Sequence, residues 1–278
     1  MLLNILTILS ILLAVLICAI GGGFASLSWL WMLPVGFLGS FLVLAAIYTV
    51  ILWALCQRIN PEEPREEDSP FYRRLAMVTI DALIRLLRIR IHAEGLEKVP
   101  SDGRFFLVCN HTFIADPAIL LHCLPNSQLV FISKKENRDL FVVGNIMHAM
   151  LSQCIDREND RAALKTILEC IRIIKEDRAS IAVFPEGATN SDNHLYPFRP
   201  GVFKIAQKTK VPIVVCTMEG TRMIFKNALR FKPTHVKLHV LDVIPPEDFE
   251  GLKTPQLSDR VWEMMKNDLS EAYQPLEA

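Results

Sequence analysis

Apolar side chains fill the first part of the chain almost without interruption. Residues 1–20 and 29–55 are two apolar runs, and a short glycine- and serine-rich stretch separates them. A helix needs ~20 apolar residues to cross a bilayer, so both runs are long enough. The pattern predicts that residues 1–57 form a helical hairpin that anchors the protein in a membrane. Three polar residues share one helical face of the first run and would let it lie in one leaflet instead: Asn4, Thr7 and Ser10.

A charged, proline-punctuated segment follows the hairpin, at residues 58–70. It has too little apolar surface to pack, so it predicts a linker between the anchor and a domain that spans residues 71–278. Residues 71–87 then carry apolar side chains at helical spacing with arginines around them. This helix could pack on the domain surface or rest on anionic lipid.

The rest of the chain alternates between short apolar runs and amphipathic stretches. The short runs predict strands at residues 89–93, 105–109, 129–133, 152–156, 180–184, 213–217 and 236–243. The amphipathic stretches predict helices at residues 116–123, 139–150, 161–176, 202–208 and 256–273. Strands that alternate with helices indicate an α/β domain with a mixed, largely parallel sheet flanked by helices.

Charge separates the two parts of the chain sharply. All 30 Lys and Arg and all 30 Asp and Glu lie from Arg58 onward, so a formal net charge of zero conceals an uncharged N-terminal segment. Arginines cluster after the second apolar run, which predicts that the domain lies on the cytoplasmic face of a membrane. A cleaved signal peptide is disfavoured, because no Lys or Arg precedes the first run and a second run follows at once.

The seven cysteines are scattered through the chain, mostly inside apolar runs, and none forms a Cys-x-x-Cys pair. This usage indicates buried, reduced thiols in a cytosolic domain. No grouping of Cys and His has the spacing of a zinc site, so we expect no metal.

Polar residues follow several of the predicted strands at the point where each strand ends. They are His111, Lys134, Asp156, Arg157 and Glu186. Ligands of open α/β sheets gather outside the carboxyl ends of the strands, so these side chains are expected along one edge of the sheet.

His111 and Asp116 are the strongest candidates for catalysis. Both follow the apolar run at residues 105–109, and a turn after the strand can fold the carboxylate back to the imidazole. The carboxylate would accept the Nδ1 proton and leave Nε2 free to take a proton from a substrate hydroxyl. Asp116 could also cap the following helix, with Pro117 at the first helical position.

Four sequence blocks carry a resemblance to a known family. Asn110, His111 and Asp116 match the N-H-x-x-x-x-D motif of the glycerolipid acyltransferases, the family of 1-acylglycerol-3-phosphate acyltransferases. Residues 184–187 resemble its F-P-E-G signature, residues 155–157 its F-I-D-R block and residues 211–214 its V-P-I block. The blocks occur in the family's order across residues 88–220.

The resemblance implies transfer of a fatty acyl group from a thioester, on coenzyme A or acyl carrier protein, to a lysophospholipid. The leading acceptor is 1-acyl-sn-glycerol-3-phosphate, which would give phosphatidate at a membrane. His111 would be the general base and Asp116 its partner, with no cofactor or metal. The residues expected to bind substrate are Asn110, Lys134, Arg157, Glu186, Gly187 and Arg199. Lys135 is a further basic candidate, and arginine suits this role because its guanidinium pairs with phosphate in a fork.

The chain departs from the family pattern directly after F-P-E-G. Many lysophosphatidate acyltransferases have T-R-S there, with an arginine tied to recognition of the acceptor phosphate, whereas this chain has Ala188, Thr189 and Asn190. Threonine supplies no positive charge. The departure favours another lysolipid or a hydroxylated acyl lipid as an alternative acceptor.

Three further interpretations remain open. The same base could activate water, which would make the protein an acyl thioester hydrolase. A membrane scaffold without catalytic activity could bind lipid or acyl carrier protein. Cys109 shares a strand face with His111 and could form a covalent acyl-enzyme, although cysteines in apolar runs are usually inert.

Overall fold

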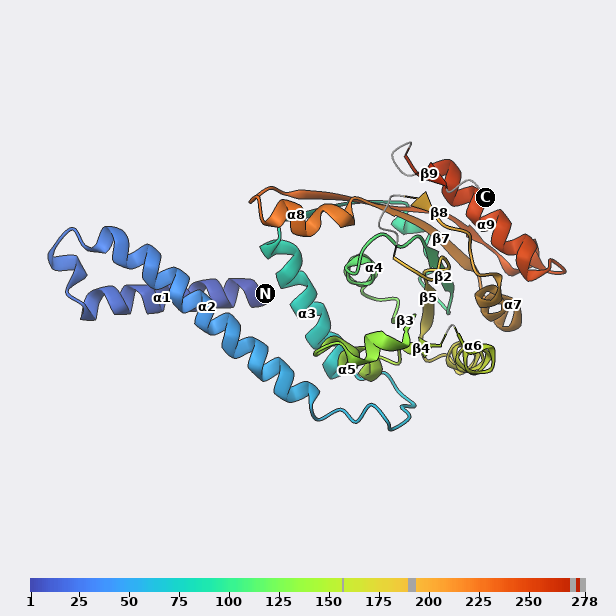
Figure 1. The fold of residues 1–278 in the computed structure, drawn as a ribbon, viewed down its shortest axis with the longest axis horizontal. Helices are drawn as coiled ribbons and strands as arrows, with labels where there is room; N and C mark the ends of the chain where they lie inside the picture. Colours follow the sequence, from blue (N-terminus) through green and yellow to red (C-terminus); the bar gives the residue numbers. More distant parts are fainter. Residues whose placement is uncertain (157, 190–193, 271–273, 276–278) are drawn as a thin grey trace.

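The structure is a computed structural model that describes residues 1–156, 158–189, 194–270 and 274–275. It consists of an N-terminal helical hairpin and an α/β domain (Figure 1). The hairpin helices are α1 (Leu2–Ile20) and α2 (Trp29–Cys56), and both are long and apolar enough to cross a membrane. Most of their large apolar side chains are exposed, as expected of helices that contact lipid.

The hairpin is joined to the domain through α3 (Pro70–Leu86), the helix that the sequence predicts at residues 71–87. The Tyr48 hydroxyl lies 2.6 Å from that of Thr79, and the Tyr72 hydroxyl donates to the carbonyl of Leu55 at 2.9 Å. In Figure 1 the hairpin projects from one side of the domain, with both of its ends at α3.

The segment at residues 58–70 packs more closely than the sequence suggests. Glu66 forms ion pairs with Arg172 (2.8 Å) and Arg178 (3.5 Å), and the carbonyl of Glu63 lies 3.0 Å from Nε2 of His148. The expectation of an unpacked linker was wrong in this respect, because ion pairs and a backbone carbonyl hold the segment to the domain and Ile59 is only 3% exposed.

A seven-stranded mixed sheet forms the centre of the domain, in the order β1-β8-β7-β2-β5-β3-β4. Every neighbouring pair is parallel except β7 and β8, which are antiparallel. The strands are β1 (Ile89–Glu94), β2 (Phe106–Cys109), β3 (Leu129–Lys134), β4 (Gln153–Ile155), β5 (Ser180–Val183), β7 (Ile213–Glu219) and β8 (Thr234–Ile244). A separate two-stranded pair joins β6 (His194–Leu195) to β9 (Gln274–Pro275). The predicted mixed, largely parallel sheet is confirmed.

Helices cover both faces of the sheet and close two apolar cores. Side chains of α6, α7 and α9 fill one core, and those of α3 and α4 fill the other. The helices of the domain after α3 are α4 (Asp116–Cys123), α5 (Val143–Ala149), α6 (Asp160–Lys175), α7 (Lys204–Thr209), α8 (Ile224–Ala228) and α9 (Thr254–Asp268).

Three predicted helices differ from the structure. The stretch at residues 139–150 is a 3-10 turn (Lys135–Asp139) followed by α5, because Val142 has a φ of 62° and the backbone turns sharply there. The stretch at residues 202–208 likewise begins as a 3-10 turn before α7. The last helix, expected to reach residue 273, ends at Asp268. Helix α8 was not expected.

Candidate active site

His111 lies at the carboxyl end of β2, the strand between β7 and β5. The preceding residue fixes how the chain leaves the strand. Asn110 is fully buried, and its amide pairs with the backbone of Met218: Nδ2 donates to the carbonyl at 2.9 Å, and Oδ1 accepts from the N–H at 2.7 Å. Both ends of this amide are therefore occupied by β7, which anchors the chain immediately before the imidazole.

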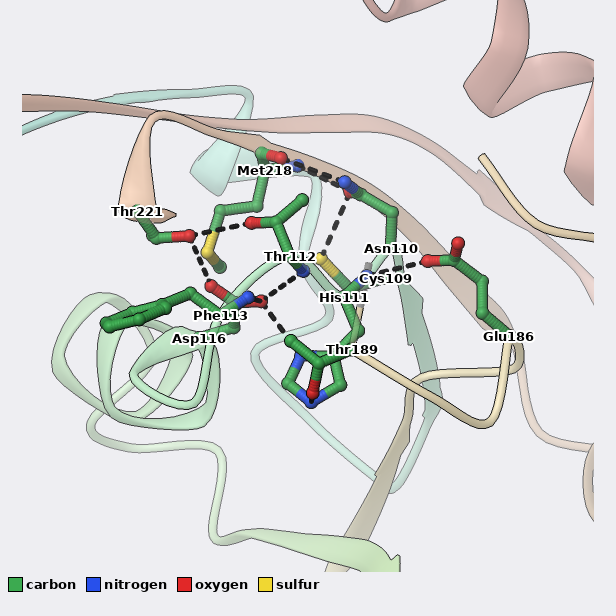
Figure 2. Close-up of polar contacts among 10 residues, drawn as sticks. All are labelled: Cys109, Asn110, His111, Thr112, Phe113, Asp116, Glu186, Thr189, Met218 and Thr221. Atoms are coloured by element: carbon green, nitrogen blue, oxygen red, sulfur yellow. Dashed lines mark hydrogen bonds and ion pairs between the residues drawn. The ribbon is translucent and has the colours of Figure 1, made fainter. Parts of the chain in front are cut away.

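His111 and Asp116 form the expected pair (Figure 2). Nδ1 of His111 donates to Oδ2 of Asp116 at 2.8 Å, since a carboxylate can only accept. A tight turn brings the two side chains together although they are five residues apart. The N–H groups of Thr112 and Phe113 in this turn also donate to Oδ2, at 2.7 and 2.8 Å. Ala115, not Asp116, is the N-cap of α4. With the proton on Nδ1, Nε2 is the unprotonated nitrogen of the imidazole and can accept a hydrogen bond.

Thr221 satisfies the second oxygen of the buried carboxylate. Its hydroxyl donates to Oδ1 of Asp116 at 2.5 Å and lies 2.8 Å from the hydroxyl of Thr112. Asp116 is 0% exposed and accepts four hydrogen bonds, which compensates the loss of water around a buried charge. The sequence analysis missed Thr221. Its position just beyond the carboxyl end of β7 was the available signal.

Glu186 of the F-P-E-G segment binds the backbone of the site. Its Oε1 accepts from the N–H of His111 at 2.7 Å, and its Oε2 accepts from the N–H of Tyr196 at 2.8 Å. The side chain is buried. From the loop after β5, Glu186 thus connects the end of β2 to the residue that follows β6, and Figure 2 shows the carboxylate reaching across to the backbone at His111.

An aromatic side chain supports the imidazole from one side. Phe184 stacks on His111 with ring centroids 4.2 Å apart and an interplanar angle of 21°. Phe131 stacks in turn on Phe184 at 6.1 Å. The phenylalanine of F-P-E-G therefore fixes the ring plane of His111, a role that the sequence analysis did not assign to it.

Thr189 lies at the open side of the imidazole. Its hydroxyl is 3.2 Å from Nε2 of His111 and donates to it, since Nδ1 carries the proton (Figure 2). The Thr189 side chain is exposed, whereas that of His111 is 17% exposed. A hydroxyl of the protein thus occupies the position from which a substrate hydroxyl would donate its proton.

Gly187 and Arg199 are in close contact beside this position. Gly187 has a φ of 78°, and a Cβ there would lie 2.7 Å from Nε of Arg199. The N–H of Arg199 donates to the carbonyl of Pro185 at 2.9 Å. The missing side chain of the glycine leaves the space that the exposed arginine side chain uses.

The other basic candidates lie farther along the sheet. Lys134 ends β3, two strands from β2, and pairs with Glu136 at 3.4 Å. Lys135 pairs with Asp156 at 2.9 Å, and Asp156 holds the pKa of this lysine above its usual value. Arg157 lies outside the described residues.

Of the cysteines near the site, Cys109 is fully buried and Cys123 is partly buried. Burial raises the pKa of Cys109 well above its usual value, and burial likewise raises the pKa of Cys123 to about 11. A protonated thiol is a weak nucleophile, which disfavours a covalent acyl-enzyme on Cys109. Over the part of the chain that the structure describes, no group of three or more His, Cys, Asp and Glu side chains could hold a metal ion.

The chain is similar to known acyltransferases. A family model described as Acyltransferase matches residues 90–219, which contain His111, Asp116 and Glu186. The 1-acyl-sn-glycerol-3-phosphate acyltransferase of Cocos nucifera is 29% identical over 236 residues, 84% of this chain and 75% of that protein. Residues 90–219 are therefore an acyltransferase domain like that of the glycerolipid acyltransferases.

Two further comparisons agree with this similarity. The 1-acyl-sn-glycerol-3-phosphate acyltransferase alpha of Homo sapiens is 28% identical over 177 residues, 63% of this chain and 62% of that protein. The crystal structure of the LPA acyltransferase PlsC from Thermotoga maritima matches with a TM-score of 0.55 at 21% identity, over 80% of this chain and 95% of that chain. That likeness confirms the fold.

Proposed function

We propose that this acyltransferase moves a fatty acyl group from an acyl thioester to the hydroxyl of a lysophospholipid, with 1-acyl-sn-glycerol-3-phosphate as the leading acceptor and phosphatidate as the product. The observation that carries the proposal is the imidazole of His111. Its Nδ1 is held by the buried Asp116, and its Nε2 already accepts a hydrogen bond from a hydroxyl. The curated relatives named above carry this activity in their names.

In the proposed reaction Nε2 of His111 removes the proton of the acceptor hydroxyl as its oxygen attacks the thioester carbonyl. The tetrahedral intermediate then collapses, the carbon–sulfur bond breaks, and the thiolate takes the proton from the imidazolium. Asp116 stabilises that imidazolium. A thiol with a pKa of ~8.5 leaves readily, so activation of the alcohol is the main demand on the protein. No cofactor is needed beyond the thioester of coenzyme A or acyl carrier protein.

We propose that Asn110 and Glu186 position His111 and do not contact the acceptor. The polar atoms of Asn110 are bonded to Met218, and each oxygen of Glu186 accepts a backbone N–H. This differs from the substrate-binding role that the sequence suggests for both residues. It places the F-P-E-G glutamate in the scaffold of the site.

Arg199 is the basic residue best placed to hold an acceptor phosphate. It contacts the F-P-E-G turn at Gly187, next to the position where the family often has an arginine and this chain has Thr189. A guanidinium in this position can pair with a phosphate in a fork. Lys134 at the end of β3 is assigned a secondary role in binding the acceptor, and Arg157 remains a candidate from the sequence alone.

We also propose that the domain acts at the cytoplasmic face of a membrane. The arginines that follow α2 favour that side, and both ends of the hairpin lie at α3. The acceptor and product are membrane lipids, so an anchored domain keeps its active site where both reside.

The test is acyl transfer by the purified full chain from a labelled acyl thioester to a panel of lysolipids, glycerol 3-phosphate and water. We expect product with lysophosphatidate that disappears in His111→Ala and in Asp116→Asn. Release of free fatty acid without any acceptor would identify a thioester hydrolase. Activity unchanged in His111→Ala would contradict the proposed base.

A second acceptor class is favoured by one observation, the neutral Thr189 at the position of the family's arginine. Transfer to a lysolipid without a phosphomonoester, but not to lysophosphatidate, would support it. In that case Thr189→Arg should raise transfer to lysophosphatidate. A scaffold without catalytic activity is disfavoured because it would not require a buried carboxylate with four donors.

A further inference from the structure

The connection between β7 and β8 has an unusual composition for a surface segment. Residues 220–241 contain no Asp or Glu, and the surface formed by residues 222–232 carries the four basic side chains Arg222, Lys226, Arg230 and Lys232. The same surface exposes three large apolar side chains: Phe225 (57%), Leu229 (84%) and Phe231 (85%). Large apolar residues that are this exposed on a soluble surface usually mark a contact with another phase or partner.

This surface lies on the side of the domain from which the hairpin projects. In Figure 1 the turn from α8 to β8 reaches the edge of the domain beside the end of α3. The two segments are in direct contact, because Nη1 of Arg88, two residues beyond α3, donates to the carbonyl of Phe231 at 2.6 Å. Leu83 and Leu86 at the end of α3 are also exposed. The apolar surface is therefore continuous with α3.

The hairpin continues the same surface on the other side of α3. The N-terminal ammonium of Met1 in the hairpin pairs with Asp81 at 3.4 Å, and Asp81 lies within a turn of Leu83. One side of the molecule thus carries, in order, the apolar hairpin, the end of α3 and the 222–232 surface.

The 222–232 surface also reaches the active site. Phe225 packs edge-on against Phe113 with ring centroids 5.1 Å apart, and Phe113 donates its N–H to Asp116. Ile114 in the same active-site loop is 61% exposed. Apolar side chains therefore extend from the membrane side of the domain to the loop that holds the imidazole.

We propose that the 222–232 surface is a second membrane contact, which binds the anionic headgroup layer of the bilayer that holds the hairpin. Phe225, Leu229 and Phe231 enter the boundary between headgroups and acyl chains, and Lys226, Arg230 and Lys232 pair with lipid phosphates. This contact turns the loop at His111 toward the bilayer, so that a lysolipid reaches the base without leaving the membrane. The proposal rests on the proposed function for the identity of that lipid.

Charge and position both favour lipid as the binding partner of the 222–232 surface. A polybasic surface with no acidic residue matches the negative potential of a leaflet that contains anionic lipid. The hairpin fixes this side of the domain near a bilayer, so the exposed phenylalanine and leucine side chains need to travel only a short distance to be buried there. A second copy of the chain would present the same positive charge and be repelled.

The first experiment measures depth and does not depend on activity. A nitrobenzoxadiazole fluorophore is attached to Phe231→Cys in the full chain, with Cys123 and Cys154 changed to Ser because the other five cysteines are buried. The matched control is Lys175→Cys on α6, an exposed site on the opposite side of the domain. The protein is reconstituted in phosphatidylcholine vesicles with or without phosphatidylglycerol.

We expect blue-shifted emission and quenching by spin-labelled lipids for the label at residue 231, stronger with phosphatidylglycerol, and water-like emission at residue 175. Water-like emission at both sites would overturn the proposal. A blue shift in detergent that grows with protein concentration would overturn it as well, because a second copy would then cover the surface.

The second experiment separates membrane contact from chemistry. Leu229→Ser/Phe231→Ser should lower transfer to a long-chain lysolipid in vesicles about tenfold or more, and leave transfer to a water-soluble short-chain acceptor in detergent unchanged. The control, Leu164→Ser/Leu168→Ser, removes two exposed leucines from α6 and should change neither rate. Equal loss with both acceptors would overturn the membrane contact. If the unmodified protein shows no acyl transfer at all, only the proposed function is contradicted. The depth measurement tests the membrane contact without any acyl transfer.

Discussion

The hydroxyl of Thr221 donates a hydrogen bond of 2.5 Å to Oδ1 of Asp116, a residue 105 positions earlier in the chain. The other oxygen of this carboxylate receives the imidazole of His111 and two backbone N–H groups. Thr221 is therefore the side chain that holds the remaining oxygen, and it fixes the rotation of the carboxylate against the imidazole.

Thr221→Val should lower kcat about tenfold to a hundredfold with little change in KM, because a buried charged acceptor that loses its donor costs ~1.5–3 kcal/mol. Thr221→Ser retains the hydroxyl and should restore most of the rate. The measurement is steady-state kinetics of both variants. Thr234→Val is the matched control, since Thr234 is also buried but its hydroxyl has no hydrogen-bond partner among the described residues. A rate loss as large in Thr234→Val would show that the effect is only one of packing.

Glu186→Gln should lower both activity and thermal stability. Each carboxylate oxygen now accepts a backbone N–H, from His111 and from Tyr196. Glutamine keeps one acceptor and turns an NH₂ group toward the other N–H, which costs ~1–3 kcal/mol. We expect a lower Tm in calorimetry and a fall in kcat, because the backbone that carries the imidazole shifts.

Glu219→Gln serves as the control for the loss of a negative charge near the end of a strand. Glu219 lies at the end of β7, where it accepts from the exposed Ser270. This variant should keep both Tm and kcat near the values of the unmodified protein. If Glu186→Gln behaves in the same way, Glu186 does not clamp His111 in the working enzyme.

Much of the fold and the catalytic pair could be predicted from the sequence. Strand positions follow from apolar runs, and His111 and Asp116 are close in sequence, so a turn suffices to join them. Thr221, Phe184 and the clamping role of Glu186 could not be derived in this way. Their contacts depend on β7 and β5 flanking β2, and strand order is a property of the whole sheet that no local pattern records.

The break before α5 has a different cause. The apolar spacing at residues 139–150 is compatible with one helix, but a Cβ at Gly144 would lie 1.9 Å from the carbonyl oxygen of Arg138. The chain can fold back so closely only at a glycine. The packing of residues 58–70 also could not be predicted from the sequence, since the ion pair of this segment with α6 depends on tertiary position and not on an apolar pattern.

Cys109→Ala should retain acyl transfer. Burial raises the pKa of Cys109 well above its usual value, so the thiol stays protonated at pH values where an unfolded cysteine has ionised. Iodoacetamide at pH 8 should therefore leave the activity of the folded protein intact, and guanidinium should expose the thiol to reaction. The measurement is the rate of alkylation by mass spectrometry beside the acyl transfer rate. Inactivation that follows alkylation of Cys109 would restore the acyl-enzyme interpretation.

Gly187→Ala tests whether the F-P-E-G turn positions Arg199 for the acceptor. Gly187 has a φ of 78°, and a Cβ would lie 2.7 Å from Nε of Arg199. Gly103 has a φ of 75° with no atom within 4 Å of the Cβ position. Alanine at either glycine should cost ~1–2 kcal/mol of stability from the left-handed backbone alone. Gly103→Ala is therefore a matched control for backbone strain.

The two variants should differ in their kinetics. Only Gly187→Ala displaces the guanidinium, so only this variant should raise KM for a phosphate-bearing acceptor, by about tenfold if one charge-assisted hydrogen bond is lost. Arg199→Ala should raise KM by a similar factor, and the Gly187→Ala/Arg199→Ala double variant should be no worse than either single variant, because both remove the same contact. Additive effects of the two substitutions on KM would contradict this prediction. They would show that Arg199 binds the acceptor independently of the turn, or that Gly187 is needed only for its backbone conformation.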